Sequence, residues 1–329
     1  MSEKIGIRRS VQINAHDKSP ESFRSVGGSD MLRASLRAQL ASLLGPGFPG
    51  DGFRNVTQLG VSDRNGWILE DLLFEGAGGE LISALFLRPP DGNDAVPAVV
   101  YAHAHGNRYD MGREELTEGR PALQGPYAKD LVAIGVSVLC LEMPCFGARQ
   151  HPGESERSKA LLWRGETLFG QMLAEQMAGV SFLAAHPMVR ADRIGALGFS
   201  MGSTLVWWLA AMDERICATS ALCSFADLET LVDMGAHDVH GIYMSVPGLL
   251  HVARSGLIAG LAAPRALQIC VGLQDWSTPV GAFEVARHDL EAAFAGGGRL
   301  AFHVEPDTAH EETSAMRRAV LNFLRHELY

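Results

Sequence analysis

The sequence is poor in several residue types, and each shortage excludes a class of protein. Its 329 residues include only 5 cysteines, without the spacing of a disulfide scaffold or a zinc module. Lysine and arginine number 28 against 38 acidic residues, a formal net charge of −10, which disfavours nucleic acids and anionic membranes as partners. No apolar stretch is long enough to span a membrane, and the N-terminal residues lack the apolar core of a secretion signal. We therefore expect a reduced, cytoplasmic protein.

The rest of the composition is that of a globular protein, with 47% hydrophobic and 20% charged residues. From residue 68 onward, apolar segments alternate with helical patterns. An initial hairpin followed by this alternation predicts an α/β fold, with a mostly parallel sheet and helices on both faces. We expect strands at 68–74, 81–87, 98–102, 136–141, 193–197, 216–223, 266–271 and 300–304, and helices at 127–134, 160–185, 203–212, 279–294 and 311–327.

Two segments depart from this alternation. Residues 1–28 are polar, and Ser29 can cap a helix whose leucines at 32, 36, 40 and 43 form one stripe before Gly45. That stripe must pack on the main domain or on a second subunit, so a homodimer is one expectation. We place an N-terminal helical extension at 1–55 and the main domain at 56–329. Within it, residues 225–264 are rich in Met, Leu, His and Gly and predict a small cap-like insertion.

The most informative motif is Gly198-Phe-Ser-Met-Gly202, between an expected strand and an apolar helix. Gly-x-Ser-x-Gly at a strand-to-helix turn forms a sharp bend that lifts the serine hydroxyl above the sheet. Glycine is needed there because neighbouring backbone comes too close for a Cβ atom. The motif predicts Ser200 as a nucleophile.

A serine hydroxyl is a weak nucleophile at neutral pH and needs a histidine base that an acid orients. Asp275 follows strand 266–271, and His310 follows strand 300–304. Both positions suit loops at the carboxyl edge of a parallel sheet, where the serine also lies. Asp227, just past strand 216–223, is the alternative acid. As simpler structural roles, Asp275 and His310 could each cap the helix that follows.

Developing negative charge on a substrate oxygen needs two backbone N–H donors. We expect Met201 to supply one, at the start of the helix after Ser200. The other is expected from the loop after strand 98–102, at His105 or Gly106, with His103 a hydrogen-bonding residue beneath the loop. His103-x-His105 and His237-x-x-His240 also suggest metal ligands, but neither pair has a third ligand at suitable spacing. We expect no metal and no cofactor.

These motifs resemble the α/β-hydrolase superfamily, and more narrowly the bacterial serine esterases related to dienelactone hydrolase and acetyl xylan esterase. The resemblance covers residues 67–329 and includes His-x-His-Gly, Gly-Phe-Ser-Met-Gly, Asp-x-x-x-Pro and His-Glu before a terminal helix. It implies hydrolysis of a small carboxylic ester through an acyl-enzyme. Met143-Pro-Cys145-Phe146-Gly147 resembles a loop that lines the site in these esterases, so Cys145 and Phe146 are expected to contact substrate.

Two departures from the family pattern leave the substrate open. Dienelactone hydrolases have cysteine at the elbow, and acetyl xylan deacetylases commonly have His-Gly-Tyr/His where this chain has His103-Ala-His105. The superfamily also includes peptidases, amidases and thioesterases, and a catalytically silent binding module is a further alternative. Cys145 is the alternative nucleophile. In the cap-like segment, Tyr243 and Met244 are expected to contact substrate, although such apolar residues often only seal a core.

Overall fold

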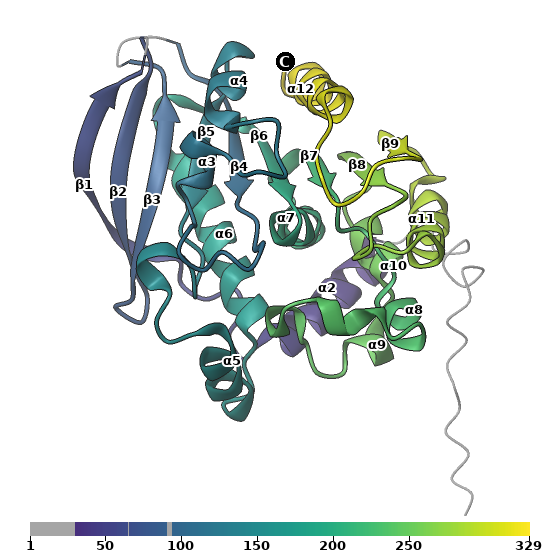
Figure 1. The fold of residues 1–329 in the computed structure, drawn as a ribbon. Coiled ribbons are helices and arrows are strands. Elements are labelled where there is room, and N and C mark those ends of the chain that lie inside the picture. The colour runs from purple at the N-terminus through teal and green to yellow at the C-terminus, as the bar shows by residue number, and fades with distance from the viewer. Residues whose placement is uncertain (1–29, 65, 91–93) are drawn as a thin grey trace, which may run out of the picture.

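The computed structural model describes residues 30–64, 66–90 and 94–329, so Ser29 and the polar segment before it lie outside the described residues. The described chain builds a nine-stranded sheet in the order β1-β2-β3-β5-β4-β6-β7-β8-β9 (Figure 1). The strands are β1 (Phe53–Asp63), β2 (Ile68–Gly76), β3 (Leu81–Arg88), β4 (Val96–Ala102), β5 (Ser137–Leu141), β6 (Val189–Phe199), β7 (Ile216–Leu222), β8 (Ala266–Gly272) and β9 (Leu300–Glu305).

The sheet is antiparallel from β1 to β5 and parallel from β5 to β9. The chain passes from β4 to β5 on one side and then to β6 on the other. Such a reversal of strand order opens a crevice at the carboxyl ends of the strands, where α/β proteins bind ligands. The six parallel strands therefore carry their loops to a single edge.

Side chains of the central strands alternate between two hydrophobic cores, one on each face of the sheet. On β4, Ala98, Val100 and Ala102 belong to one core, and Val99 and Tyr101 belong to the other. This is the two-residue period of a strand that is buried on both faces. The first core includes residues of α2 (Asp30–Leu44), α5 (Glu154–Trp163), α6 (Leu168–Ala185), α7 (Met201–Met212), α10 (Ser255–Gly260) and α11 (Val280–Phe294). The second includes residues of α3 (Glu115–Glu118), α4 (Tyr127–Ala133) and α12 (Ser314–Leu328). The expected α/β architecture is confirmed.

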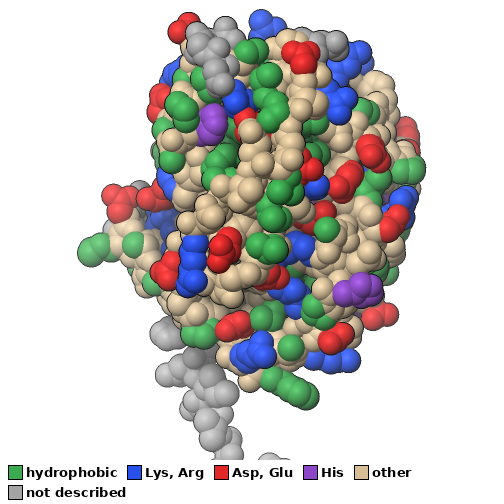
Figure 2. Space-filling model, turned by 90° about the vertical axis from the view of Figure 1, so that its left-hand side faces the viewer, with side chains coloured by type: hydrophobic (Ala, Val, Ile, Leu, Met, Phe, Trp, Pro, Cys, Tyr) green, Lys and Arg blue, Asp and Glu red, His purple; other side chains and the backbone are tan. Residues whose placement is uncertain are grey.

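The outermost strand, β1, was not predicted from the sequence. Its side chains are mostly exposed on both faces, so it shows no alternation of apolar and polar residues. It pairs with β2 along most of its length, with register shifts between Phe53 and Asn55 and between Gln58 and Gly60. Figure 2 faces this side of the molecule and shows apolar side chains interspersed with charges of both signs.

The leucine stripe of α2 packs on the main domain. Leu36, Leu40 and Leu44 are buried in the same core as α6 and α7, whereas Leu32 is exposed. Arg37 further ties the helix down, because its Nε donates to the Ala211 carbonyl at 2.7 Å. The boundary predicted between residues 55 and 56 falls within β1, and the division into extension and main domain stays a prediction.

The prediction of one continuous helix at 160–185 is wrong, because the structure has two helices there, α5 and α6. Residues 164–167 separate them, with Gly165 in the left-handed region at φ 76°. The Thr167 hydroxyl caps α6 by accepting from Gly170 N–H at 2.9 Å. Thr167 also donates from its backbone N–H and its hydroxyl to the Leu44 carbonyl, at 3.2 and 2.9 Å. The break is therefore fixed by a contact with α2.

The expected cap-like insertion at 225–264 is a series of short helices that lies beside α7, α11 and α2 (Figure 1). Tyr243 and Leu249 are among its buried residues that belong to the first core. Its helices are α8 (Leu228–Asp233), η2 (Ala236–Val239), η3 (Ile242–Met244), α9 (Leu249–Val252) and α10, and η1 (Gly147–Arg149) lies outside it, after β5.

Candidate active site

The turn between β6 and α7 holds Ser200 in a strained backbone conformation. Its φ and ψ are 56° and −120°, a region that costs a non-glycine residue about 1–3 kcal/mol. Close packing explains the flanking glycines. A Cβ on Gly198 would lie 2.3 Å from the Gly202 carbonyl, and one on Gly202 would lie 1.9 Å from the Ala102 carbonyl oxygen. This strained conformation holds the Ser200 hydroxyl at the carboxyl edge of the sheet.

The structure brings Ser200, His310 and Asp275 into one hydrogen-bonded row. Nε2 of His310 lies 2.9 Å from Ser200 Oγ, and its Nδ1 lies 2.7 Å from Asp275 Oδ2. The Asp275 side chain is fully buried, while the His310 side chain is 21% exposed. A carboxylate at Nδ1 holds the ring proton there, which leaves Nε2 free to accept a proton from the serine.

The loops that carry the acid and the histidine lie against each other. Gln274 N–H donates to the Thr308 carbonyl at 2.9 Å, and a Cβ on Gly272 would lie 2.2 Å from that same oxygen. Ser277 fixes the carboxylate from the other side, because its N–H and hydroxyl donate to Asp275 Oδ1 at 2.8 and 2.7 Å. The acid is thus held rigidly toward His310.

A buried carboxylate two residues after the histidine anchors the histidine loop. Glu312 accepts hydrogen bonds from Gln124 N–H at 3.0 Å and from the Tyr127 hydroxyl, and it pairs with Arg317 at 2.7 Å. Its own N–H donates to the Ala122 carbonyl at 2.8 Å. These bonds tie the loop to the segment before α4.

The alternative acid, Asp227, has other partners. It caps α8 by accepting from Thr230 N–H at 3.1 Å, and it pairs with Arg254 at 3.3 Å. Its side chain is fully buried at the start of the cap-like segment. The structure therefore brings Asp275, and not Asp227, to His310.

A buried ion pair holds the loop after β4, where the second oxyanion donor is expected. Glu115 accepts from Ala104 N–H at 3.0 Å and pairs with Arg120. Arg120 in turn donates to the carbonyls of Ala104 and His105, at 2.7 and 3.1 Å. Both charged side chains are at least 95% buried. Backbone groups of the loop therefore provide the hydrogen bonds that water cannot.

Changing Glu115 to Gln should destabilise the protein by about 3–5 kcal/mol, because the Arg120 charge would then be buried without its counter-ion. The free energy of unfolding, measured by urea denaturation, gives the result. Glu114→Gln is the matched control, since that side chain is 38% exposed and pairs with Arg113, and it should cost less than about 1 kcal/mol. Equal effects in the two variants would contradict the assigned role of the pair.

His103 lies beneath the loop, as expected, and joins it to the loop after β5. Its Nε2 accepts from Met143 N–H at 3.1 Å, and its Nδ1 lies 3.1 Å from the Ala104 carbonyl. Complete burial lowers the pKa of His103 to about 3, so the ring is neutral and acts as one donor and one acceptor.

Glu154 of α5 bridges two segments of the site through three hydrogen bonds. It accepts from His105 Nε2 at 2.8 Å, from the Tyr109 hydroxyl at 2.7 Å and from Tyr243 N–H at 2.8 Å. His105 Nδ1 accepts from Asn107 N–H at 3.0 Å, so the ring proton is on Nε2. Burial raises the pKa of Glu154, but these hydrogen bonds outweigh burial and lower it overall. The charged carboxylate thus links the β4 loop to the cap-like segment.

The other expected site residues surround His105. The Phe146 ring meets the His105 ring edge-on at 5.1 Å, and the Tyr243 ring stacks on it at 5.7 Å. Cys145 is buried beside Phe146, and Gly106 is exposed on the loop. Met201 is the first residue of α7, so its N–H has no acceptor within the helix. Within the described residues, no group of three or more His, Cys, Asp and Glu could hold a metal ion.

The sequence is 34% identical over 297 residues to the Bacillus subtilis (strain 168) protein named "Putative hydrolase YtaP", covering 89% of this chain and 99% of that protein. The chain belongs to the α/β-hydrolase superfamily. No family model matches it. The predicted resemblance to this superfamily is confirmed.

Solved structures share the fold of this α/β-hydrolase at low sequence identity. Acetyl xylan esterase 1 from Thermoanaerobacterium sp. JW/SL YS485 is 16% identical with a TM-score of 0.59, covering 95% of this chain and 100% of that one. A glucuronoyl esterase from Solibacter usitatus is 13% identical with a TM-score of 0.65, covering 90% and 92%. Among the described residues, no helix of this α/β-hydrolase is both long and apolar enough to cross a membrane.

Sequence reasoning missed the charged residues that support the site, namely Glu115, Arg120, Glu154 and Glu312. In the sequence each lies in a polar segment, which is typical of a solvated surface. Of these four residues, Glu312 is the one that the sequence could have indicated, because it follows His310 on the same short loop.

Proposed function

We propose that this α/β-hydrolase is a serine esterase that cleaves a small carboxylic ester through an acyl-enzyme. Ser200 is the nucleophile, His310 the base and then the acid, and Asp275 the group that orients His310. The observation that carries the proposal is the row of contacts from Ser200 Oγ to His310 at 2.9 Å and from His310 to Asp275 at 2.7 Å.

In the acylation half of this mechanism, His310 Nε2 takes the proton as Ser200 Oγ attacks the ester carbonyl. The oxyanion is stabilised by the N–H of Met201, at the positive end of α7, and by an N–H of the His105–Gly106 loop. The ester carbon–oxygen bond then breaks, and the alcohol leaves with the proton from His310. Water repeats these steps on the acyl-enzyme and releases the carboxylic acid, which regenerates Ser200.

An ester is favoured over other acyl substrates by the similar solved structures. Several with this fold are named as esterases, including an acetyl xylan esterase from Paenibacillus sp. R4 at 17% identity and a TM-score of 0.61, covering 93% of this chain and 95% of that one. A fluorophosphonate probe and a panel of nitrophenyl esters test the proposal together. Labelling at Ser200 with turnover of at least one ester supports it, and absence of both would overturn it.

Cysteine is not expected to act as the nucleophile, although Cys145 lies near the site. Burial raises the pKa of Cys145 to about 11, so only about 0.1% of this thiol is ionised at pH 8. We expect iodoacetamide at pH 8 to leave most ester hydrolysis intact and a fluorophosphonate to abolish it. Loss of ester hydrolysis in Cys145→Ala, together with inactivation of the wild type by iodoacetamide, would contradict Ser200 as the nucleophile.

A further inference from the structure

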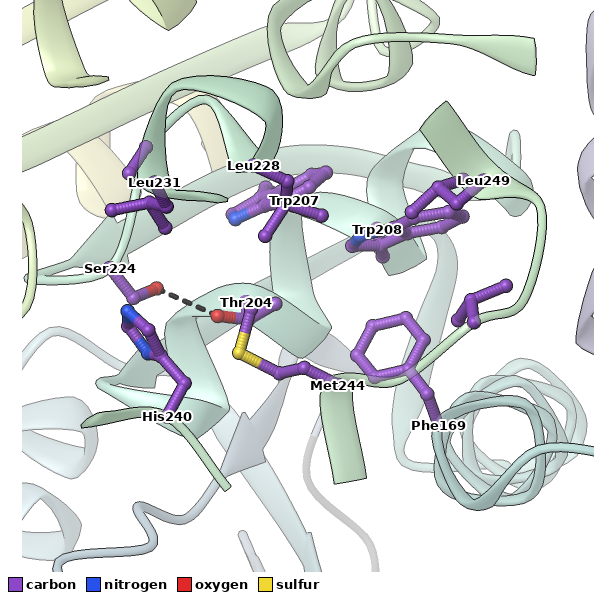
Figure 3. Close-up of a pocket in the computed structure, with 12 residues that line it drawn as sticks. Phe169, Thr204, Trp207, Trp208, Ser224, Leu228, Leu231, His240, Met244 and Leu249 are labelled. Carbon is purple, nitrogen blue, oxygen red and sulfur yellow. Dashed lines mark hydrogen bonds between the residues drawn. The ribbon is translucent and has the colours of Figure 1, made fainter. Parts of the chain in front are cut away.

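A pocket beneath the cap-like segment has a lining without carboxylates or permanent cations. Figure 3 shows Thr204, Ser224 and His240 toward one end and Phe169, Trp208 and Leu249 toward the other. Burial lowers the pKa of His240, so this single titratable group of the lining is neutral at pH 7. The full lining is Phe169, Thr204, Trp207, Trp208, Ser224, Ala226, Leu228, Leu231, His240, Met244, Val246 and Leu249.

The polar end of the pocket adjoins the proposed catalytic residues. Thr204 is one helical turn after Ser200 on α7, and its N–H donates to the Ser200 carbonyl at 3.1 Å. Its hydroxyl donates to Ser224 at 3.0 Å. His240 Nε2 lies 2.9 Å from the carbonyl of Ser277, the residue that also holds Asp275. The pocket lining therefore begins one helical turn after Ser200 and continues along α7.

The far end is walled by large buried side chains. Trp207 and Trp208 follow Thr204 by three and four residues, so all three share one face of α7. The Phe169 and Trp208 rings meet edge-on at 5.2 Å, and both side chains are 2% exposed. A group that reached this end along α7 would meet an apolar wall.

Met244 occupies the middle of this pocket in Figure 3, between the two ends. With it there, the remaining space holds about one water molecule or one methyl group. Met244 is only partly buried, and its unbranched side chain has three rotatable bonds. Its position therefore limits how long a group the pocket can take.

We propose that this pocket binds the acyl group of the substrate, that it selects uncharged apolar acyl groups, and that Met244 sets their maximum length. The inference rests on the proposed function and names the substrate class of that same site. The acyl group stays attached to Ser200 after the alcohol departs, so a pocket that ends in an apolar wall suits it. The alcohol leaves from His310, where the neighbouring Trp276 is 61% exposed and its ring centre is 6.1 Å from the imidazole.

The test compares wild type with Met244→Ala, which lengthens the pocket by three heavy atoms, and with Met244→Trp, which shortens it. The substrates are nitrophenyl acetate, butyrate, hexanoate and octanoate. We expect Met244→Ala to raise the ratio of kcat/KM for octanoate over acetate by about tenfold or more, and Met244→Trp to lower it. A nitrophenyl hemisuccinate should react about 100-fold more slowly than the butyrate, because no cation lines the pocket to pair with its carboxylate.

Met234→Ala is the matched control, because this methionine lies on the same segment but is 54% exposed and outside the pocket lining. It should leave the ratio unchanged. A second series of acetates with larger alcohols should be ranked alike by wild type and both Met244 variants. Thermal melts and fluorophosphonate labelling confirm that each variant is folded and that Ser200 reacts.

Three results would overturn the inference. The first is an unchanged acyl ranking in both Met244 variants that still label at Ser200, which leaves the proposed esterase function intact. The second is a change in alcohol ranking alone, which would assign the pocket to the alcohol. The third is failure of the wild type to label and to hydrolyse any ester, which removes the proposed function and this inference with it.

Discussion

Replacing Ser200 with alanine should lower the turnover of ester substrates by about 10⁴-fold or more, while the fold stays intact. The substitution removes only the hydroxyl that lies 2.9 Å from His310 Nε2. No other side chain of the described site offers an ionisable nucleophile in that position, because the nearby Cys145 has its pKa raised by burial. Steady-state kinetics with a nitrophenyl ester and a thermal melt measure the two effects.

Ser203→Ala is the matched control for this experiment. Ser203 lies in the first turn of α7, which Ser200 precedes, and it is fully buried. Its hydroxyl has no hydrogen-bond partner among the residues that the structure describes. Its loss should change turnover by less than about threefold. Residual activity of Ser200→Ala within about tenfold of wild type would remove Ser200 from the mechanism.

Asp275→Asn should lower turnover by about 10³–10⁴-fold without unfolding the protein. The oxygen of the introduced amide can keep the bonds from Ser277, which leaves the amide NH₂ group facing His310 Nδ1. That arrangement favours the tautomer with the proton on Nε2, and this tautomer cannot accept the Ser200 proton. Steady-state kinetics at saturating ester measure the loss.

Asp227→Asn is the comparison, because Asp227 is the alternative acid and is also fully buried. It should lower stability through the weakened pair with Arg254 and leave turnover within about fivefold of wild type. Reversed effects of the two variants would mean that the orienting acid follows β7.

Much of the fold and the three proposed catalytic residues could be predicted because their signals are local. Each parallel strand is a short apolar run, and Ser200, Asp275 and His310 each follow such a run directly. Parallel strands carry their loops to one edge of the sheet, so all three residues are expected at that edge. The contacts among them in the structure agree with that reasoning, while their roles stay a proposal.

The features that could not be predicted depend on contacts between distant segments. The break between α5 and α6 is stabilised by Thr167 against Leu44, 123 residues earlier. Glu154 acts on the cap-like segment through Tyr243, 89 residues later. A charged residue in a polar segment favours a surface position, and only its distant partners offset the cost of burial. The roles of such side chains can be recognised only in the folded structure.

The register shifts in β1 limit how well this edge of the sheet can pair with other chains. An outermost strand with apolar residues such as Val56, Leu59 and Val61 exposed is a template for aggregation when its hydrogen-bonding groups form an unbroken row. The two irregularities interrupt that row within 11 residues. A strand from another chain could pair with only short stretches of β1. The sheet is therefore expected to end at β1 and not to add strands from other chains.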